Sequence, residues 1–123
     1  MTWFIPASGQ KQNAPSADGI FAGKTGGDYT VEELSQSDWT IRAADPGYSV
    51  TEFKMTIVFK KGTTSFQYYH GFTGYEIIGN IIPMQYRDKI LNEAEKVYLE
   101  YIKAANERRV TITVKPIEFR IQP

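Results

Sequence analysis

The chain has 123 residues, and its 14 basic residues balance its 14 acidic ones. A balanced charge gives no general attraction to nucleic acid or to an anionic membrane surface, so we expect neither as a partner. The sequence contains no cysteine, which excludes disulfides and thiolate chemistry within it. Its length is typical of one domain that buries enough surface to hold a core.

The first 19 residues are expected to precede the folded domain. Residues 1–9 are apolar and end in small residues at the spacing of a signal-peptidase site, although no basic segment precedes them. They fit either the tail of a secretory signal or a loose terminus. Residues 10–19 are polar and contain a proline, which favours a flexible tether. We therefore expect a leader remnant and a tether over residues 1–19, and one domain over residues 20–123.

Three short features come next along the chain. The segment GKTGG at residues 23–27 lacks the glycine order of a phosphate-binding loop, so we expect no nucleotide there. Thr30 and Glu33 have the spacing of a capping box, which predicts a single helical turn. Apolar residues alternate with polar ones over residues 39–43, which predicts a strand that ends at the turn 45–47.

The run VTEFKMTIVF at residues 50–59 is the strongest strand signal in the chain. Its alternation predicts one buried face, made of Phe53, Met55, Ile57 and Phe59. Burying these side chains contributes roughly 6–12 kcal/mol before the entropy cost of folding. One strand cannot bury this face alone, so the remaining sequence has to supply neighbouring strands and a second layer.

A second alternating run follows a Lys-Gly turn and covers residues 64–70. It predicts a strand that forms a tight hairpin with the run before it. In such a strand Phe66, Tyr68 and His70 share one face, and Tyr69 points to the other.

The remaining predicted elements are a short strand at 75–79, a helix at 84–94, and strands at 97–102, 110–114 and 117–121. In the first long strand of this group, alternation places Tyr101 on the face of Val97 and Leu99. Pro116 separates the strand at 110–114 from the strand at 117–121, because proline donates no backbone hydrogen bond.

Short strands separated by turns about every eight to twelve residues are typical of a sandwich. We therefore predict a mainly β chain that folds as a two-layer antiparallel β-sandwich with one or two short helices. The apolar run at residues 77–84 is interrupted by glycine, asparagine and proline, and it is far shorter than the roughly 20 residues of a membrane helix. We expect no membrane insertion of this chain.

The sequence offers little for catalysis. His70 is the only histidine, so neither a paired base nor an imidazole metal shell can be completed around it. The aspartates are dispersed and form no calcium loop. Pairs of glutamates exist, but such pairs are more often solvated than catalytic. We expect no enzyme activity, no catalytic residue, no metal and no cofactor.

An aromatic segment is the best candidate for binding. Tyr69, Phe72 and Tyr75 lie close together in the sequence, and we predict that they bind a partner. Tyrosine combines a large apolar ring with a hydroxyl that can stay in water, which suits a protein or a sugar contact. The alternative is that these rings only cover a sheet.

Four segments of the chain resemble one known family. They are FAGKTGGDYTVEEL at residues 21–34, EFKMTIVF at 52–59, KVYLEYIKA at 96–104 and KPIEFRIQ at 115–122. In this order they resemble the C-terminal domain of GldM, the periplasmic shaft protein of gliding motility and type IX secretion in Bacteroidetes.

The resemblance implies an immunoglobulin-like β-sandwich without a catalytic centre, located in the periplasm and making contacts within an envelope assembly. GldM-type proteins also carry a membrane helix and further periplasmic domains. The resemblance covers only their last domain, so a role in force transmission is not carried over.

Two functional hypotheses stay open. The first is a non-enzymatic periplasmic interaction module that binds an envelope protein or a second copy of itself as a homodimer. The alternative is a carbohydrate or cell-wall binding module that uses tyrosines on its surface.

Overall fold

The computed structural model describes residues 16–122. Most of the leader and tether expected over residues 1–19 therefore lies outside the described residues. Strand pairing is already present at Ser16 and Ala17, which lie beside Thr113 and Val114. Folded structure thus begins before residue 20, where we expected the domain to start.

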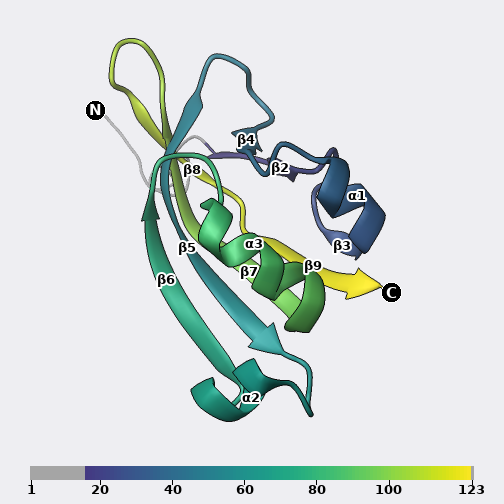
Figure 1. Ribbon diagram of the computed structural model, residues 1–123. Helices are drawn as coiled ribbons and strands as arrows, with labels where there is room; N and C mark the ends of the chain where they lie inside the picture. The colour runs from purple at the N-terminus through teal and green to yellow at the C-terminus, as the bar shows by residue number, and fades with distance from the viewer. Residues whose placement is uncertain (1–15, 123) are drawn as a thin grey trace, which may run out of the picture.

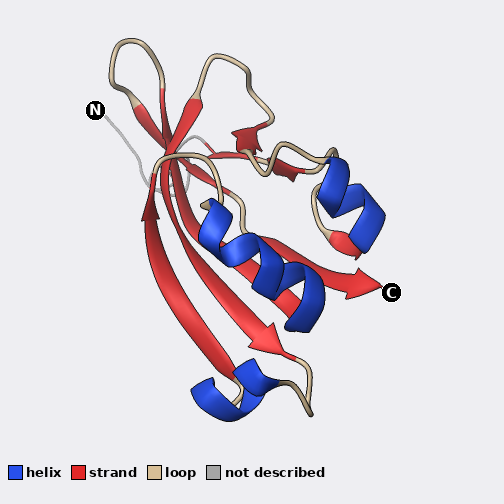
Figure 2. Ribbon diagram, in the orientation of Figure 1, coloured by secondary structure: helices blue, strands red, loops and turns tan. Residues whose placement is uncertain are grey.

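The chain forms short helices among many strands (Figures 1 and 2). In order these are β1 (Ser16–Ala17), β2 (Gly19–Phe21), β3 (Gly27–Thr30), α1 (Val31–Gln36), β4 (Ile41–Ala43), β5 (Ser49–Phe59), α2 (Thr64–Tyr69), β6 (Phe72–Ile78), α3 (Met84–Glu93), β7 (Ala94–Ala105), β8 (Thr111–Val114) and β9 (Ile117–Gln122). The prediction of a mainly β protein is confirmed. None of the helices within residues 16–122 has the length and apolar character that a membrane crossing needs.

The large sheet is organised around three antiparallel strands in the order β6, β5, β7. The first half of β7 pairs with β9 and its second half pairs with β8, both antiparallel. Two short strands extend this side of the sheet in parallel, β1 beside β8 and β3 beside β9. A separate antiparallel pair, β2 with β4, makes the second sheet.

A second layer covers one face of the large sheet. Figure 1 shows α3, α1 and the small sheet on the same side of it. The four side chains of β5 that the sequence predicts to be buried, Phe53, Met55, Ile57 and Phe59, are buried in this layer, and Val50 near the start of the strand is buried as well. This arrangement of two packed layers is consistent with a β-sandwich. An immunoglobulin-like strand order stays a prediction.

A stack of aromatic rings joins the two layers. The ring of Phe119 lies 5.3 Å from that of Phe21 and 4.7 Å from that of Tyr29. The Tyr29 hydroxyl donates a hydrogen bond of 2.8 Å to the Phe21 carbonyl oxygen, and burial raises the pKa of Tyr29 to about 12. The expected capping box follows directly, because the Thr30 side chain accepts from the Glu33 N–H and Glu33 accepts from the Thr30 N–H.

The strand predicted over residues 64–70 is wrong, because this segment is helix α2. Thr63 caps the helix by accepting a 3.1 Å hydrogen bond from the Phe66 N–H, and His70 ends it with a φ of 59°. The side chains of Phe66 and Tyr69 pack against the core and are three residues apart. A six-residue segment that mixes apolar and polar residues fits both the two-residue period of a strand and the 3.6-residue period of a helix. The N-cap at Thr63 favours the helix.

The face predicted for Tyr101 is also wrong. Its φ is 51°, and the register between β5 and β7 shifts between Glu52 and Lys54, where Phe53 alone faces two residues of β7. This β-bulge turns Tyr101 to the outside and brings Ile102, which is fully buried, onto the inner face. The rest of the predicted strand pattern in β7 is kept.

The register of β5 can be tested with two aspartate substitutions. Ile57→Asp places a charge on the buried face and should lower the free energy of unfolding by at least about 3 kcal/mol, enough to unfold a marginally stable domain. Thr56→Asp changes the opposite, partly exposed face and should cost much less. Urea denaturation followed by circular dichroism measures both. Greater damage from Thr56→Asp would mean that the inward and outward faces are exchanged.

Candidate functional site

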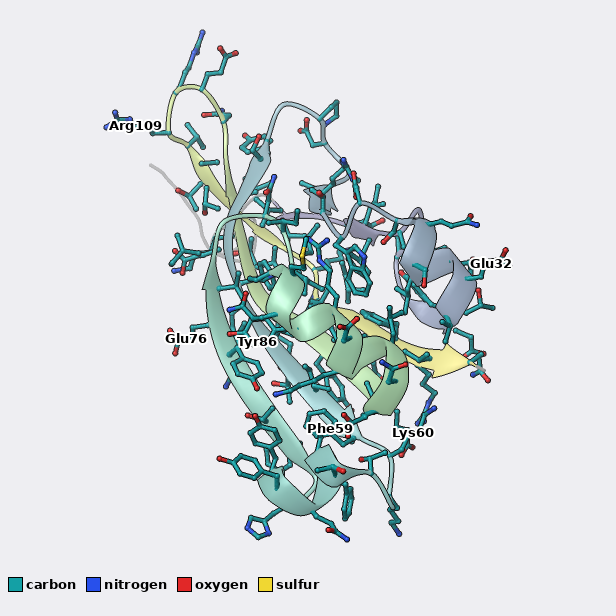
Figure 3. All side chains as sticks on the ribbon, viewed as in Figure 1. Glu32, Phe59, Lys60, Glu76, Tyr86 and Arg109 are labelled. Atoms are coloured by element: carbon teal, nitrogen blue, oxygen red, sulfur yellow. The ribbon has the colours of Figure 1, made fainter. Side chains whose placement is uncertain are left out.

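The structure brings two of the three predicted binding residues together. Tyr69, from α2, stacks on Phe59 with ring centres 5.5 Å apart. Tyr75, from β6, packs against Tyr86 of α3 at 4.3 Å. The Lys89 ammonium donates a 3.1 Å hydrogen bond to the Tyr69 hydroxyl. Figure 3 shows Phe59 and Tyr86 in this region, between α3 and the strands of the large sheet.

The three polar groups of this tyrosine cluster, defined as Tyr69, Tyr75 and Lys89, influence each other's ionisation. The hydrogen bond from Lys89 lowers the pKa of Tyr69, and the neighbouring Tyr75 hydroxyl acts in the same direction. Burial, reinforced by Tyr69, raises the pKa of Tyr75. The interaction with Tyr69 raises the pKa of Lys89. Lys89 thus keeps its charge and fixes the Tyr69 side chain against the core.

This placement differs from the one that the predicted hairpin implied. Tyr69 is half-buried against Phe59, while its neighbour Tyr68 is 75% exposed and touches Tyr69 only edge-on. The exchange follows from the helix, because only in a strand would Tyr69 point away from the core while Phe66 points into it. The cluster therefore contributes packing, and its role in binding a partner stays a prediction.

Phe72 lies on the other side of the large sheet. In β6 it is opposite Val58, whereas Tyr75 is opposite the buried Met55, so the two rings face opposite sides. The Phe72 side chain is 63% exposed. The structure therefore separates Phe72 from the tyrosine cluster and places it on what we call the outer face, the face of β6, β5 and β7 opposite the small sheet and α3.

A groove on the outer face is the better candidate site. It encloses about 400 Å³ and is lined by Glu52, Phe53, Lys54, Glu76, Ile77, Ile78 and Tyr101. Two of its apolar side chains are largely in solvent, Ile78 at 85% and Tyr101 at 72% exposure. Large apolar side chains gathered on one side of a small protein commonly mark a contact surface.

The bulge in β7 builds one wall of this groove. Lys54 lies opposite Glu100 and Glu52 lies opposite Lys103, so the single residue Phe53 faces both Tyr101 and Ile102. A regular strand would have placed Tyr101 in the core. In the sequence, the adjacent apolar residues Tyr101 and Ile102 break the alternation, but which of them is buried is shown only by the structure, where the buried residues of β7 change parity between Leu99 and Ile102.

Charged groups of both signs surround the groove. Glu52 and Lys103 approach each other at 3.8 Å, while Lys54 and Glu76 form no ion pair within residues 16–122. The apolar centre and charged border are the composition of a protein-binding surface.

His70 is exposed at the end of α2, and no group of three His, Asp or Glu residues within 16–122 is placed to hold a metal ion. The sequence matches no protein-family model and no curated protein. The candidate site therefore rests on the geometry of this chain.

The packing of the tyrosine cluster predicts different effects for two adjacent tyrosines. Tyr69→Ala removes the stacking on Phe59 and the bond from Lys89, and it should lower the free energy of unfolding by about 2 kcal/mol. Tyr68→Ala, the control, should cost less than about 1 kcal/mol. Urea denaturation distinguishes them, and equal effects would contradict the packing described for Tyr69.

The positive φ at the bulge predicts that Tyr101 lowers the free energy of unfolding relative to glycine at this position. A non-glycine residue at this φ is strained by about 1 kcal/mol. Tyr101→Gly should therefore leave the free energy of unfolding unchanged or raise it by up to about 1 kcal/mol, while Tyr101→Val should lower it by about 1–2 kcal/mol. Thermal and urea denaturation measure both. A clear loss of stability in Tyr101→Gly would show that the ring supports the fold.

Proposed function

We propose that this protein is a non-enzymatic protein–protein interaction module that binds its partner through the outer face. The observation that carries the proposal is the exposure of Phe72, Ile78 and Tyr101 on a face that no helix or strand of residues 16–122 covers. Burying such side chains in an interface removes apolar surface from water, and clustered aromatic anchors supply most of the affinity in many complexes.

The shape of the site favours a protein over a small ligand. Phe72 and Ile78 stand at opposite ends of β6, six residues apart, with Gly74 and Glu76 between them on the same face, so the exposed apolar side chains mark both ends of the strand. A strand rises about 3.3 Å per residue, which separates these ends by roughly 20 Å. This span suits a folded partner or an extended chain.

A carbohydrate is the second candidate, and one observation favours it. The exposed ring of Tyr101 stands beside the carboxylates of Glu52 and Glu76 and the ammonium of Lys54 in a single groove. An aromatic face with nearby donors and acceptors is what a sugar ring needs. Tyr69 and Tyr75, two of the residues predicted from the sequence to bind a partner, are only partly exposed and offer less ring surface to a sugar than Tyr101 does.

The location and pathway of the module follow from the resemblance of its segments to the GldM C-terminal domain. We infer a periplasmic protein of an envelope assembly similar to those of gliding motility and type IX secretion. An immunoglobulin-like arrangement belongs to the same inference, and the two packed layers support it.

The proposal predicts that binding depends on the outer face alone. In a pull-down from envelope extracts, the full chain should capture a partner that the double variant Ile78→Ser with Tyr101→Ser loses by at least about tenfold. Met84→Ser is the control, since Met84 is 76% exposed on α3, in the layer on the opposite side.

Two outcomes would contradict the proposal. Equal capture by the wild-type chain and the double variant would exclude the outer face. Binding of the wild-type chain to glycans or peptidoglycan fragments, lost in Tyr101→Ser while no protein is captured, would establish the carbohydrate function instead.

A further inference from the structure

The free edge of β6 gives a more specific inference, which deepens the proposed function by naming an occupant for this border of the sheet. We propose that two copies of the chain pair through their β6 strands, antiparallel and centred on Tyr75, so that the large sheet continues across a two-fold axis. Three independent features carry this proposal: the unpaired backbone groups, the position of the apolar side chains, and the position of the charges.

The backbone of β6 is ready for a further strand. The strand pairs with β5 on one side only, and within the described residues nothing pairs with its other side (Figure 1). The Phe59 N–H donates to the Gly71 carbonyl oxygen and the Gly79 N–H donates to the Thr51 carbonyl oxygen. Because the register between them is continuous, the odd-numbered residues of β6 bond to β5, and Phe72, Gly74, Glu76 and Ile78 direct their backbone groups outward.

This edge lacks the features that usually prevent edge pairing. The strand has seven residues, FTGYEII, with neither proline nor lysine and no register shift against β5. The strands at the opposite border are shorter, with two residues in β1 and four in β3. An exposed strand of this length and regularity is a template for another strand.

The sequence of β6 is complementary to itself when reversed about Tyr75. In that register Phe72 lies opposite Ile78 of the second copy, and Gly74 lies opposite its Glu76. Both pairs belong to the outward-directed set, so the two strands exchange roughly eight backbone hydrogen bonds. Each exposed Phe72 then covers an exposed Ile78 on the outer face, twice per dimer.

The charges favour the same register. A Cβ atom built on Gly74 would lie 3.4 Å from Lys54 Cε, so the lysine side chain lies across Gly74 toward the edge. Glu76 projects away from the rest of the molecule at this border (Figure 3) and has no ion-pair partner within residues 16–122. In the dimer, Glu76 of one copy is opposite Gly74 of the other, which brings it to Lys54, a residue that lies opposite Glu76 of its own chain without forming an ion pair to it. The symmetry repeats this contact.

A charge exchange between two variants tests the proposal. The full wild-type chain should sediment as a dimer at high concentration. Glu76→Lys places two lysines opposite each other at both contacts, and Lys54→Glu places two glutamates there, so each variant alone should dimerise roughly tenfold more weakly. Mixing the two variants restores both attractions, and native mass spectrometry should show the mixed dimer in excess over either self-dimer.

Glu107→Lys is the matched control, because Glu107 is exposed in the loop between β7 and β8. It should dimerise as the wild type does, and circular dichroism should show that all variants are folded. Three results would overturn the proposal: a monomeric wild-type chain at every concentration, unchanged dimers of both charge variants, or no mixed dimer. None of these results predicts whether the pull-down with the Ile78→Ser and Tyr101→Ser double variant captures a partner, so the proposed function is tested separately.

Cysteine cross-linking can test the proposed register between the two β6 strands, since the sequence contains no cysteine of its own. Tyr75→Cys puts two thiols at the centre of the proposed pairing, where they should oxidise to a disulfide-linked dimer. Thr73→Cys moves the thiols to opposite sides of the axis and should cross-link poorly. The reverse result would contradict a register centred on Tyr75.

Discussion

The division of β7 between two partners is the constraint on which the rest of the large sheet depends. Its first half has to present a regular edge to β9 and its second half has to present one to β8, while its other side stays paired with β5. β8 and β9 are separated by Lys115 and Pro116, and proline donates no ladder hydrogen bond. The bulge at Tyr101 lies between the two halves of β7. The bulge in β7 and the break between β8 and β9 thus lie side by side in the sheet.

This irregularity shapes the surface as well as the core. By adding one residue, the bulge keeps Leu99 and Ile102 both buried and moves Tyr101 out beside Ile78. The backbone of Tyr101 pays for this with a positive φ. A strained residue that exposes an aromatic ring contributes nothing evident to folding, and this is the physical reason for assigning it to recognition.

The two faces of the large sheet divide the tasks of the molecule. The inner face is closed by the aromatic stack of Phe21, Tyr29 and Phe119 and by the tyrosine cluster under α3. Lys89 donates a hydrogen bond to the Tyr69 hydroxyl there, while the neighbouring Tyr68 is exposed. We propose that contacts with other molecules use the outer face and the border formed by β6, which meet at Phe72 and Ile78.

The sequence by itself determined the class of the protein and most of its elements. Alternation in residues 50–59, the capping box at Thr30 and the proline before α3 each act over a few residues, so they were predictable from local rules. The helix at residues 64–69 was not predictable in this way, because a six-residue segment fits the periods of both a strand and a helix and the cap at Thr63 was not recognised. Only the tertiary structure decided where the aromatic residues point. Phe72 and Tyr75 were separated by the pleat of β6, and Tyr101 was turned outward by a bulge whose cause, the change of partner along β7, lies in strands distant in the sequence.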